Sequence, residues 1–122
     1  MKESTRKFGR STLIAAALAL PLGLLPMTAQ AATGAQIFQA RCAMCHGKDG
    51  TGSTFIGKEE KIVNFKSAAF QKSVTDAKIK NTILNGIDRT KDGVKQRMFA
   101  FKGKLSAADV DALVKYVRSL GK

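Results

Sequence analysis

The chain has 122 residues, of which 44% are hydrophobic, and its 21 lysines and arginines exceed its nine acidic residues to give a formal net charge of +12 at pH 7. This length has room for one modest domain. The positive charge is compatible with nucleic acid, an anionic membrane or an acidic protein as partner, but no nucleic-acid recognition motif is present.

Residues 1–31 have the composition of a cleavable secretory signal peptide. Four basic residues precede an apolar run over residues 13–25, and the small Ala29 and Ala31 follow at a cleavage site. The run is shorter than the ~20 residues that span a bilayer, so an uncleaved N-terminal anchor is the weaker alternative. We expect cleavage after Ala31, export to the periplasm, and a soluble monomeric domain of residues 32–122.

A first helix is predicted to begin at Gly34, with Thr33 as its N-cap. Ile37 and Phe38 give this helix one apolar side. It runs directly toward the two cysteines of the chain, so the segment before the cysteines is expected to be helical.

Residues 42–46 have the sequence Cys-Ala-Met-Cys-His and contain both cysteines and the only histidine of the chain. C-x-x-C-H is the pattern of c-type haem attachment. Thiols three residues apart on a helical turn, as in Cys42 and Cys45, can add to the two vinyl groups on one side of a porphyrin. The imidazole of His46 is then placed under the iron as an axial ligand. One covalently bound haem c would also supply apolar core to this small domain.

Three other interpretations of these residues compete with haem attachment. A thioredoxin-like C-x-x-C site needs a strand before the first cysteine. A zinc site needs a fourth ligand, and the chain has no further cysteine or histidine. A disulfide between Cys42 and Cys45 would close a very short loop and leave His46 without a role.

The middle of the chain alternates between loops and short helices. Glycines punctuate residues 47–57, which predicts a loop, and residues 64–70 predict a short helix. Thr75 is the expected N-cap of a helix over residues 76–85, with Gly86 as its C-terminal stop.

The last helix is predicted to begin after Ser106, where Asp109 takes the place of glutamate in a capping box. Gly121 is predicted to end it. Its apolar side is formed by Val110, Leu113, Val114, Val117 and Leu120, and its polar side by Asp111, Lys115 and Arg118. No strand pattern is found along the chain, so the predicted fold class is all-α.

Residues 91–101 are polar as far as Met98. After residue 31 the only other methionine is Met44, which lies between the two cysteines and cannot reach around a porphyrin. Met98 is therefore predicted to be the second axial ligand of the iron. The ordinary alternative is a core methionine that fills a packing gap.

This pattern resembles the class I c-type cytochromes, which are single-haem electron carriers with histidine and methionine ligands. The resemblance covers residues 34–120 and is most specific at Cys42, Cys45 and His46. Residues 98–101 resemble the Met-Pro-x-Phe ligand loop of that family. The resemblance implies a small cytochrome c fold, in which helices pack around one covalently bound haem.

The resemblance also implies that Gly34 and Phe38 of the first helix pack against Leu113 and Tyr116 of the last helix. The chain departs from the family pattern at Phe99, where the family usually has proline.

No proline occurs after residue 31, although the family commonly uses one to offer its carbonyl to the proximal histidine. We therefore expect a backbone carbonyl near Phe55 or Ile56 to accept the hydrogen bond from His46.

The predicted function is electron transfer by a carrier that is not an enzyme. Acidic redox proteins are the expected partners, nucleic acid is not, and membranes are met only transiently or through redox complexes. Docking would be steered by Lys48, Lys58, Lys61, Lys95, Lys102 and Lys104, unless the lysines serve only solubility. Two other functions stay open: an open-site haem enzyme or gas-binding sensor, and a dedicated cytochrome subunit of a dehydrogenase or oxidase complex.

Overall fold

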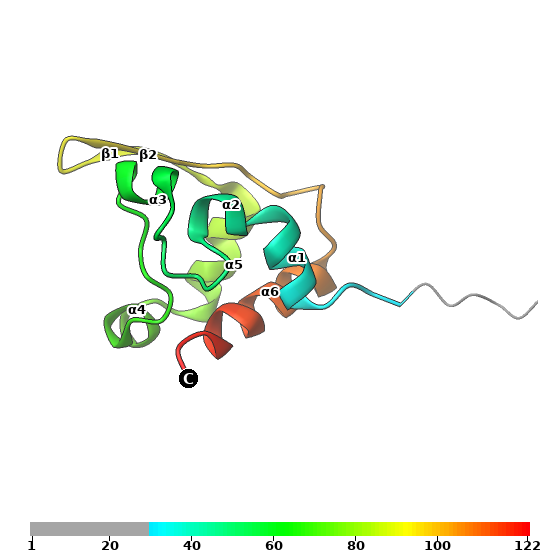
Figure 1. Cartoon of the computed structure of the whole chain (residues 1–122). Coiled ribbons are helices and arrows are strands. Elements are labelled where there is room, and N and C mark those ends of the chain that lie inside the picture. The colour runs from blue at the N-terminus through cyan, green and yellow to red at the C-terminus, as the bar shows by residue number, and fades with distance from the viewer. Residues whose placement is uncertain (1–29) are drawn as a thin grey trace, which may run out of the picture.

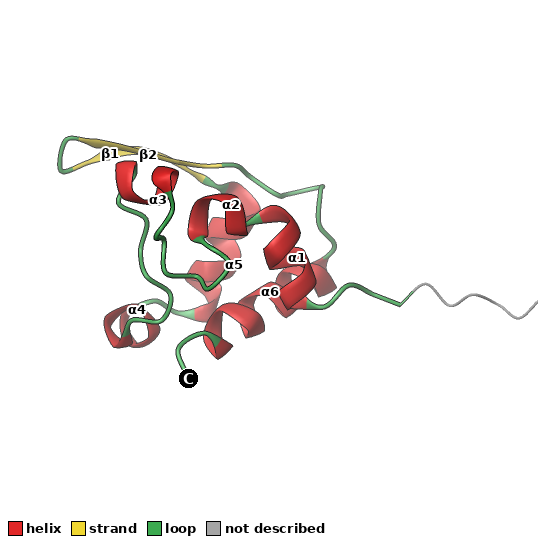
Figure 2. Ribbon diagram, viewed as in Figure 1, coloured by secondary structure: helices red, strands yellow, loops and turns green. Residues whose placement is uncertain are grey.

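The computed structural model describes residues 30–122. The predicted signal peptide lies outside the described residues, except for Gln30 and Ala31. Figures 1 and 2 show helices packed together, with a long hairpin along one side. The elements are α1 (Gly34–Arg41), α2 (Ala43–His46), α3 (Phe55–Glu59), α4 (Ala68–Ser73), α5 (Asp76–Asn85), β1 (Ile87–Lys91), β2 (Val94–Met98) and α6 (Ala107–Ser119).

The predicted boundaries of α1, α5 and α6 are confirmed at their N-terminal ends. Thr33, Thr75 and Ser106 each adopt an extended conformation and accept a hydrogen bond from a backbone N–H in the first turn. Such caps satisfy donors that a helix leaves unpaired at its start. Asp109 completes the capping box of α6, and Gly86 ends α5 as expected.

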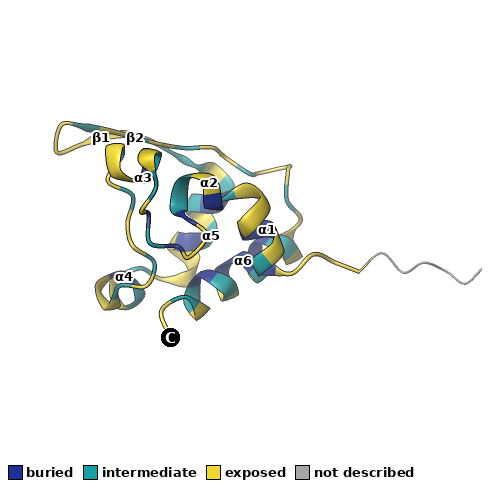
Figure 3. Cartoon of the chain, viewed as in Figure 1, coloured by how far each residue is buried: buried dark blue, intermediate teal, exposed yellow. Residues whose placement is uncertain are grey.

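The core lies where α1 crosses α6 and α5 packs beside them, as the buried segments in Figure 3 show. Phe38 and Leu113 are 1% exposed. The ring centroid of Phe38 lies 5.1 Å from that of Tyr116, and Gly34 faces the carbonyl of Ala112 and Cβ of Tyr116. The expected packing of the first helix on the last is therefore confirmed.

The prediction that the chain forms no strand is wrong for residues 87–98. β1 and β2 pair as an antiparallel hairpin in which Ile87 is opposite Met98 and Lys91 is opposite Val94. The turn residues Asp92 and Gly93 have φ values of 52° and 76°, and positive φ at both positions matches the twist of a two-residue hairpin turn. The fold is therefore a mainly helical domain with one small sheet.

Two of the short elements also differ from the prediction. The loop predicted over residues 47–57 ends early because Thr54 caps α3 through a hydrogen bond from Gly57 N–H. The helix predicted over residues 64–70 begins later, at Ala68, where Ser67 is the N-cap.

Arg118 was expected on the polar side of the last helix but is half-buried. Its guanidinium donates hydrogen bonds to the carboxylate of Asp76 at 2.6 Å, to the carbonyl of Gln71 at 3.1 Å, and to the carbonyl of Val74. These bonds attach α6 to the end of α4 and the start of α5.

Among residues 30–122, no helix has both the length and the apolar character needed to cross a membrane.

Candidate functional site

The two cysteines lie on one helical turn where α1 passes into α2. The N–H of Cys42 donates to the carbonyl of Phe38 at 2.8 Å, and the N–H of His46 donates to the carbonyl of Cys42 at 3.0 Å. Gly47 then takes a φ of +80°, which ends α2. Cys42 and Cys45 are half-buried free thiols. The segment before them is helix α1 and not the strand that a thioredoxin-like site needs, which disfavours that interpretation.

The thiols have raised pKa values. Burial, followed by the neighbouring Cys45, raises the pKa of Cys42 to about 11, and burial followed by the charge of Glu60 raises the pKa of Cys45. Reactive redox cysteines have lowered pKa values, between about 3.5 and 7.5. The environment of this pair therefore disfavours a dithiol redox site.

The imidazole of His46 is enclosed by the loop that follows it. The N–H of Gly52 donates to the carbonyl of His46 at 2.8 Å, and the ring of Phe65 stacks on the imidazole with centroids 4.7 Å apart. Burial lowers the pKa of His46 to about 4. The imidazole is therefore neutral at ordinary pH, which is the state that binds a metal.

The predicted hydrogen bond from His46 to a carbonyl near Phe55 or Ile56 is not formed. Because α3 begins at Phe55, the carbonyl of Ile56 accepts the N–H of Glu60. The side chain of Thr54 reaches back instead to the carbonyl of Cys45 at 2.7 Å. Nδ1 of His46 is left buried without a hydrogen-bond partner.

Two cavities of about 410 and 700 Å³ meet at this histidine, and Cys42, His46 and Met98 line both. These volumes lie in the range typical of pockets for small molecules and cofactors. The first cavity has apolar walls that include Phe38, Phe65, Phe70, Ile79, Leu113 and Val117. The second is lined by residues of α2, α3 and the hairpin.

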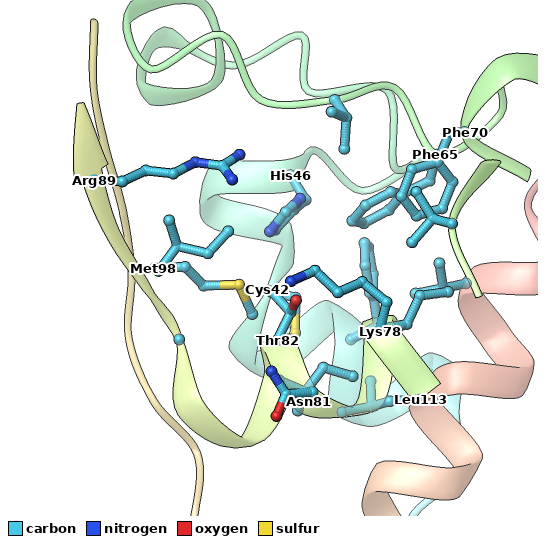
Figure 4. A pocket seen from close by; sticks show the side chains of 18 of the residues that line it. Cys42, His46, Phe65, Phe70, Lys78, Asn81, Thr82, Arg89, Met98 and Leu113 are labelled. Carbon is cyan, nitrogen blue, oxygen red and sulfur yellow. The ribbon is translucent and has the colours of Figure 1, made fainter. Parts of the chain in front are cut away.

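Met98 is half-buried at the end of β2, and Figure 4 shows that it and His46 project into the same cavity from different elements. The backbone just after it is fixed, since the N–H groups of Phe101 and Lys102 donate to carbonyls of α5 at 3.0 Å. Met44, in contrast, is 76% exposed. The structure thus brings together the four residues that the sequence singled out. Among the residues described, no cluster of three His, Cys, Asp or Glu side chains is suited to hold a metal ion.

A family model described as cytochrome c oxidase, cbb3-type, subunit III matches residues 29–117. The chain belongs to this family of c-type cytochromes. Two relatives of this cytochrome carry the name Cbb3-type cytochrome c oxidase subunit FixP. The one from Azorhizobium caulinodans is 36% identical over 94 residues, covering 77% of this chain and 28% of the relative. The one from Bradyrhizobium sp. strain ORS 278 is 33% identical over 91 residues, covering 75% and 28%. The chain thus spans 28% of the length of each.

The fold of the cytochrome is similar to that of the KustC0563 c-type cytochrome, with a TM-score of 0.61 and 31% identity over 75% of this chain and 100% of that one. A point mutant of the same protein gives a TM-score of 0.56 and 29% identity, with coverage of 73% and 99%. These similarities identify a class I c-type cytochrome with covalently bound haem c.

The residues around the cavities fit a haem. The apolar walls match a porphyrin face, the two free thiols lie at the rim, and a neutral imidazole and a thioether are the iron ligands of many cytochromes. The cytochrome also places two cations that the sequence analysis missed. Figure 4 shows Lys78 of α5 and Arg89 of β1 extending toward the same space. No sequence motif marks Lys78, and the hairpin that carries Arg89 was not predicted.

Proposed function

We propose that this cytochrome transfers single electrons through one haem c, bound covalently through Cys42 and Cys45, with His46 and Met98 as the axial iron ligands. One observation carries the proposal. A neutral, half-buried imidazole and a methionine thioether line the same two adjoining cavities, Cys42 lines both of them, and Cys45 lines the second.

The haem supplies an iron that cycles between the ferrous and ferric states. Residues of the chain would determine the relative stability of these two states. As an iron ligand, the thioether of Met98 would favour the ferrous state relative to a second imidazole, and the aromatic side chains of the first cavity would give the haem an apolar surrounding. Lys78 and Arg89, which line the first cavity, would supply positive charge to the carboxylates of a bound haem.

The test of this site uses full-length protein produced in a host that attaches c-type haem. We expect haem to remain with the polypeptide after denaturation, and to be released when Cys42 and Cys45 are both replaced by alanine. Met98→Ala should abolish the methionine-to-iron charge-transfer band of the ferric protein. Met44→Ala is the matched control, because Met44 is exposed, and should keep the band. Haem that acid-acetone extracts from the wild type would refute the proposal.

The open-site enzyme or sensor is the less favoured alternative, because Met98 lies in the cavity where an open site would leave space. It predicts a five-coordinate, high-spin ferric spectrum in the wild type. A six-coordinate, low-spin spectrum that is lost in Met98→Ala is the outcome expected here.

The surface at the second cavity suits transient docking to an acidic redox protein. Val63 and Phe99, which line its mouth, are 51% and 80% exposed, and the cations Lys61 and Arg97 lie beside them. Charges around an apolar patch steer encounter and raise association rates. In stopped-flow experiments with an acidic electron acceptor, the rate should fall as ionic strength rises, and a constant rate would exclude steering.

A second function is favoured by the names of the relatives, which are subunits of a cbb3-type cytochrome c oxidase. In this form the cytochrome is a dedicated subunit or domain of an oxidase complex. Co-purification with an oxidase at high salt would support it, whereas elution as a free monomer supports the carrier.

Export to the periplasm completes the proposal, because c-type cytochromes function outside the cytoplasm. We propose that residues 1–31 are removed during export. N-terminal sequencing of the protein from the periplasmic fraction should begin at Ala32, and an intact Met1 on a membrane-bound protein would indicate an uncleaved anchor.

A further inference from the structure

The segment that follows the haem-binding motif and the strand that ends at Met98 meet at Glu60. Glu60 is the half-buried C-cap residue of α3. Its carbonyl accepts a hydrogen bond from Nε2 of Gln96 at 3.0 Å, and its carboxylate accepts one from the N–H of Arg97 at 2.7 Å. Within the described residues, no other hydrogen bond joins residues 47–63 to the hairpin.

The position of Arg97 makes this contact important for Met98. Arg97 is paired with Asp88 in the hairpin register and directly precedes Met98. In a two-stranded sheet each strand is an edge, so its outward N–H groups have no strand to pair with. The Arg97 N–H is such a group, and the Glu60 carboxylate accepts it. A bond to an ionised acceptor is stronger than one between neutral groups.

Gln96 extends the same connection across the hairpin. Its amide oxygen accepts a hydrogen bond from Nε of Arg89 at 2.9 Å while its amide nitrogen donates to Glu60. Both strands are therefore attached to α3 through one glutamate. Figure 1 shows α3 lying close beside the hairpin, at the end of the molecule remote from α6.

Within the described part of the chain, the backbone around Met98 is otherwise held by β1 and α5. Ile87 pairs with Met98 in the hairpin, and the N–H of Phe101 donates to the carbonyl of Ile83. Neither contact restrains β2 on the side that faces α3 and the second cavity. Glu60 supplies that restraint, and it does so one residue from the thioether ligand.

We propose that Glu60 is a positioning residue that holds β2 against α3 and so keeps the Met98 thioether over the iron. This inference rests on the proposed function, in which Met98 is an axial ligand. Glu60 would then determine how often the methionine leaves the iron, and hence how accessible the distal site is to external ligands.

The experiment measures cyanide binding to the ferric holoprotein, because cyanide must wait for the methionine to leave the iron. We expect Glu60→Ala to bind cyanide about tenfold faster than the wild type, which corresponds to about 1.4 kcal/mol. Glu60→Gln keeps an oxygen that can accept the Arg97 N–H and should stay within about threefold of the wild type. Glu59→Ala is the matched control, since it removes the same charge from an exposed neighbour and should not change the rate.

The outcomes separate this inference from the proposed function. Met98→Ala gives the rate of a site without the methionine. A wild type as fast as Met98→Ala refutes methionine ligation, and with it the role of Glu60. A slow wild type with Glu60→Ala no faster than Glu59→Ala refutes the role of Glu60 alone. If Glu60→Ala does not fold, Glu60→Asp keeps the charge but shortens the side chain by one methylene, which withdraws the carboxylate from the Arg97 N–H. An unchanged cyanide rate in Glu60→Asp overturns the inference.

Discussion

Replacing Gly34 with alanine tests the close approach of α1 and α6. A Cβ at this position would lie 2.2 Å from the carbonyl oxygen of Ala112 and 3.0 Å from Cβ of Tyr116. Ordinary contacts between such atoms are about 3.5 Å, so α1 and α6 would have to separate by about 1 Å. Overpacking of this kind costs about 1–3 kcal/mol, and the better helix propensity of alanine returns at most about 1 kcal/mol.

We therefore expect Gly34→Ala to lower the free energy of unfolding by about 1–2 kcal/mol, which moves the melting temperature of a domain of this size down by about 10 °C. The assay is thermal unfolding of the holoprotein followed by far-UV circular dichroism, at equal haem content. Ala40→Gly is the control, because Ala40 is exposed on the same helix and should show only the propensity difference. A Gly34→Ala protein as stable as the wild type would refute the close crossing.

The other predictions concern Arg118 and Gly86. Arg118→Met removes the donors that satisfy backbone carbonyls at the end of α4 and should cost about 2 kcal/mol in urea unfolding, whereas Lys115→Met, on the exposed side of α6, should stay within about 0.5 kcal/mol. Gly86→Ala would place a Cβ 2.3 Å from the carbonyl oxygen of Met98 at a φ of +71° and should weaken the methionine-to-iron band. Gly103→Ala has a similar φ of +76° but open space around it, so it should keep the band.

The capped helices could be predicted because their signals are local. Thr75 and Ser106 mark helix starts by side-chain bonds to residues three positions on, and such bonds depend on nothing outside the segment. The C-x-x-C-H motif was equally local. For these reasons α5 was predicted at its observed bounds, α6 at its observed start, and the motif on one helical turn.

The hairpin was missed although its turn carries a recognisable signal. Asp92 and Gly93 form the Asp-Gly pair typical of two-residue hairpin turns, but the flanking sequences IDRTK and VKQRM are mostly polar and lack the alternation of apolar and polar residues that predicts a half-buried strand. The hairpin is held to the rest of the domain by tertiary contacts, which include the hydrogen bonds of Gln96 and Arg97 to Glu60. Contacts of this kind join residues 36 and 37 positions apart, and no pattern within one segment shows them.

The packing of α1 on α6 means that the core of the domain can close only when both helices are present. These helices lie near opposite ends of the described chain, and Phe38 is buried against the ring of Tyr116. Ribosomes deliver the N-terminal part first, so the partner of α1 arrives last. Until then the cysteine-bearing turn has no closed core behind it. A chain that lacks residues from 107 onward would therefore carry its motif on an open segment, and the domain would close only once α6 is in place.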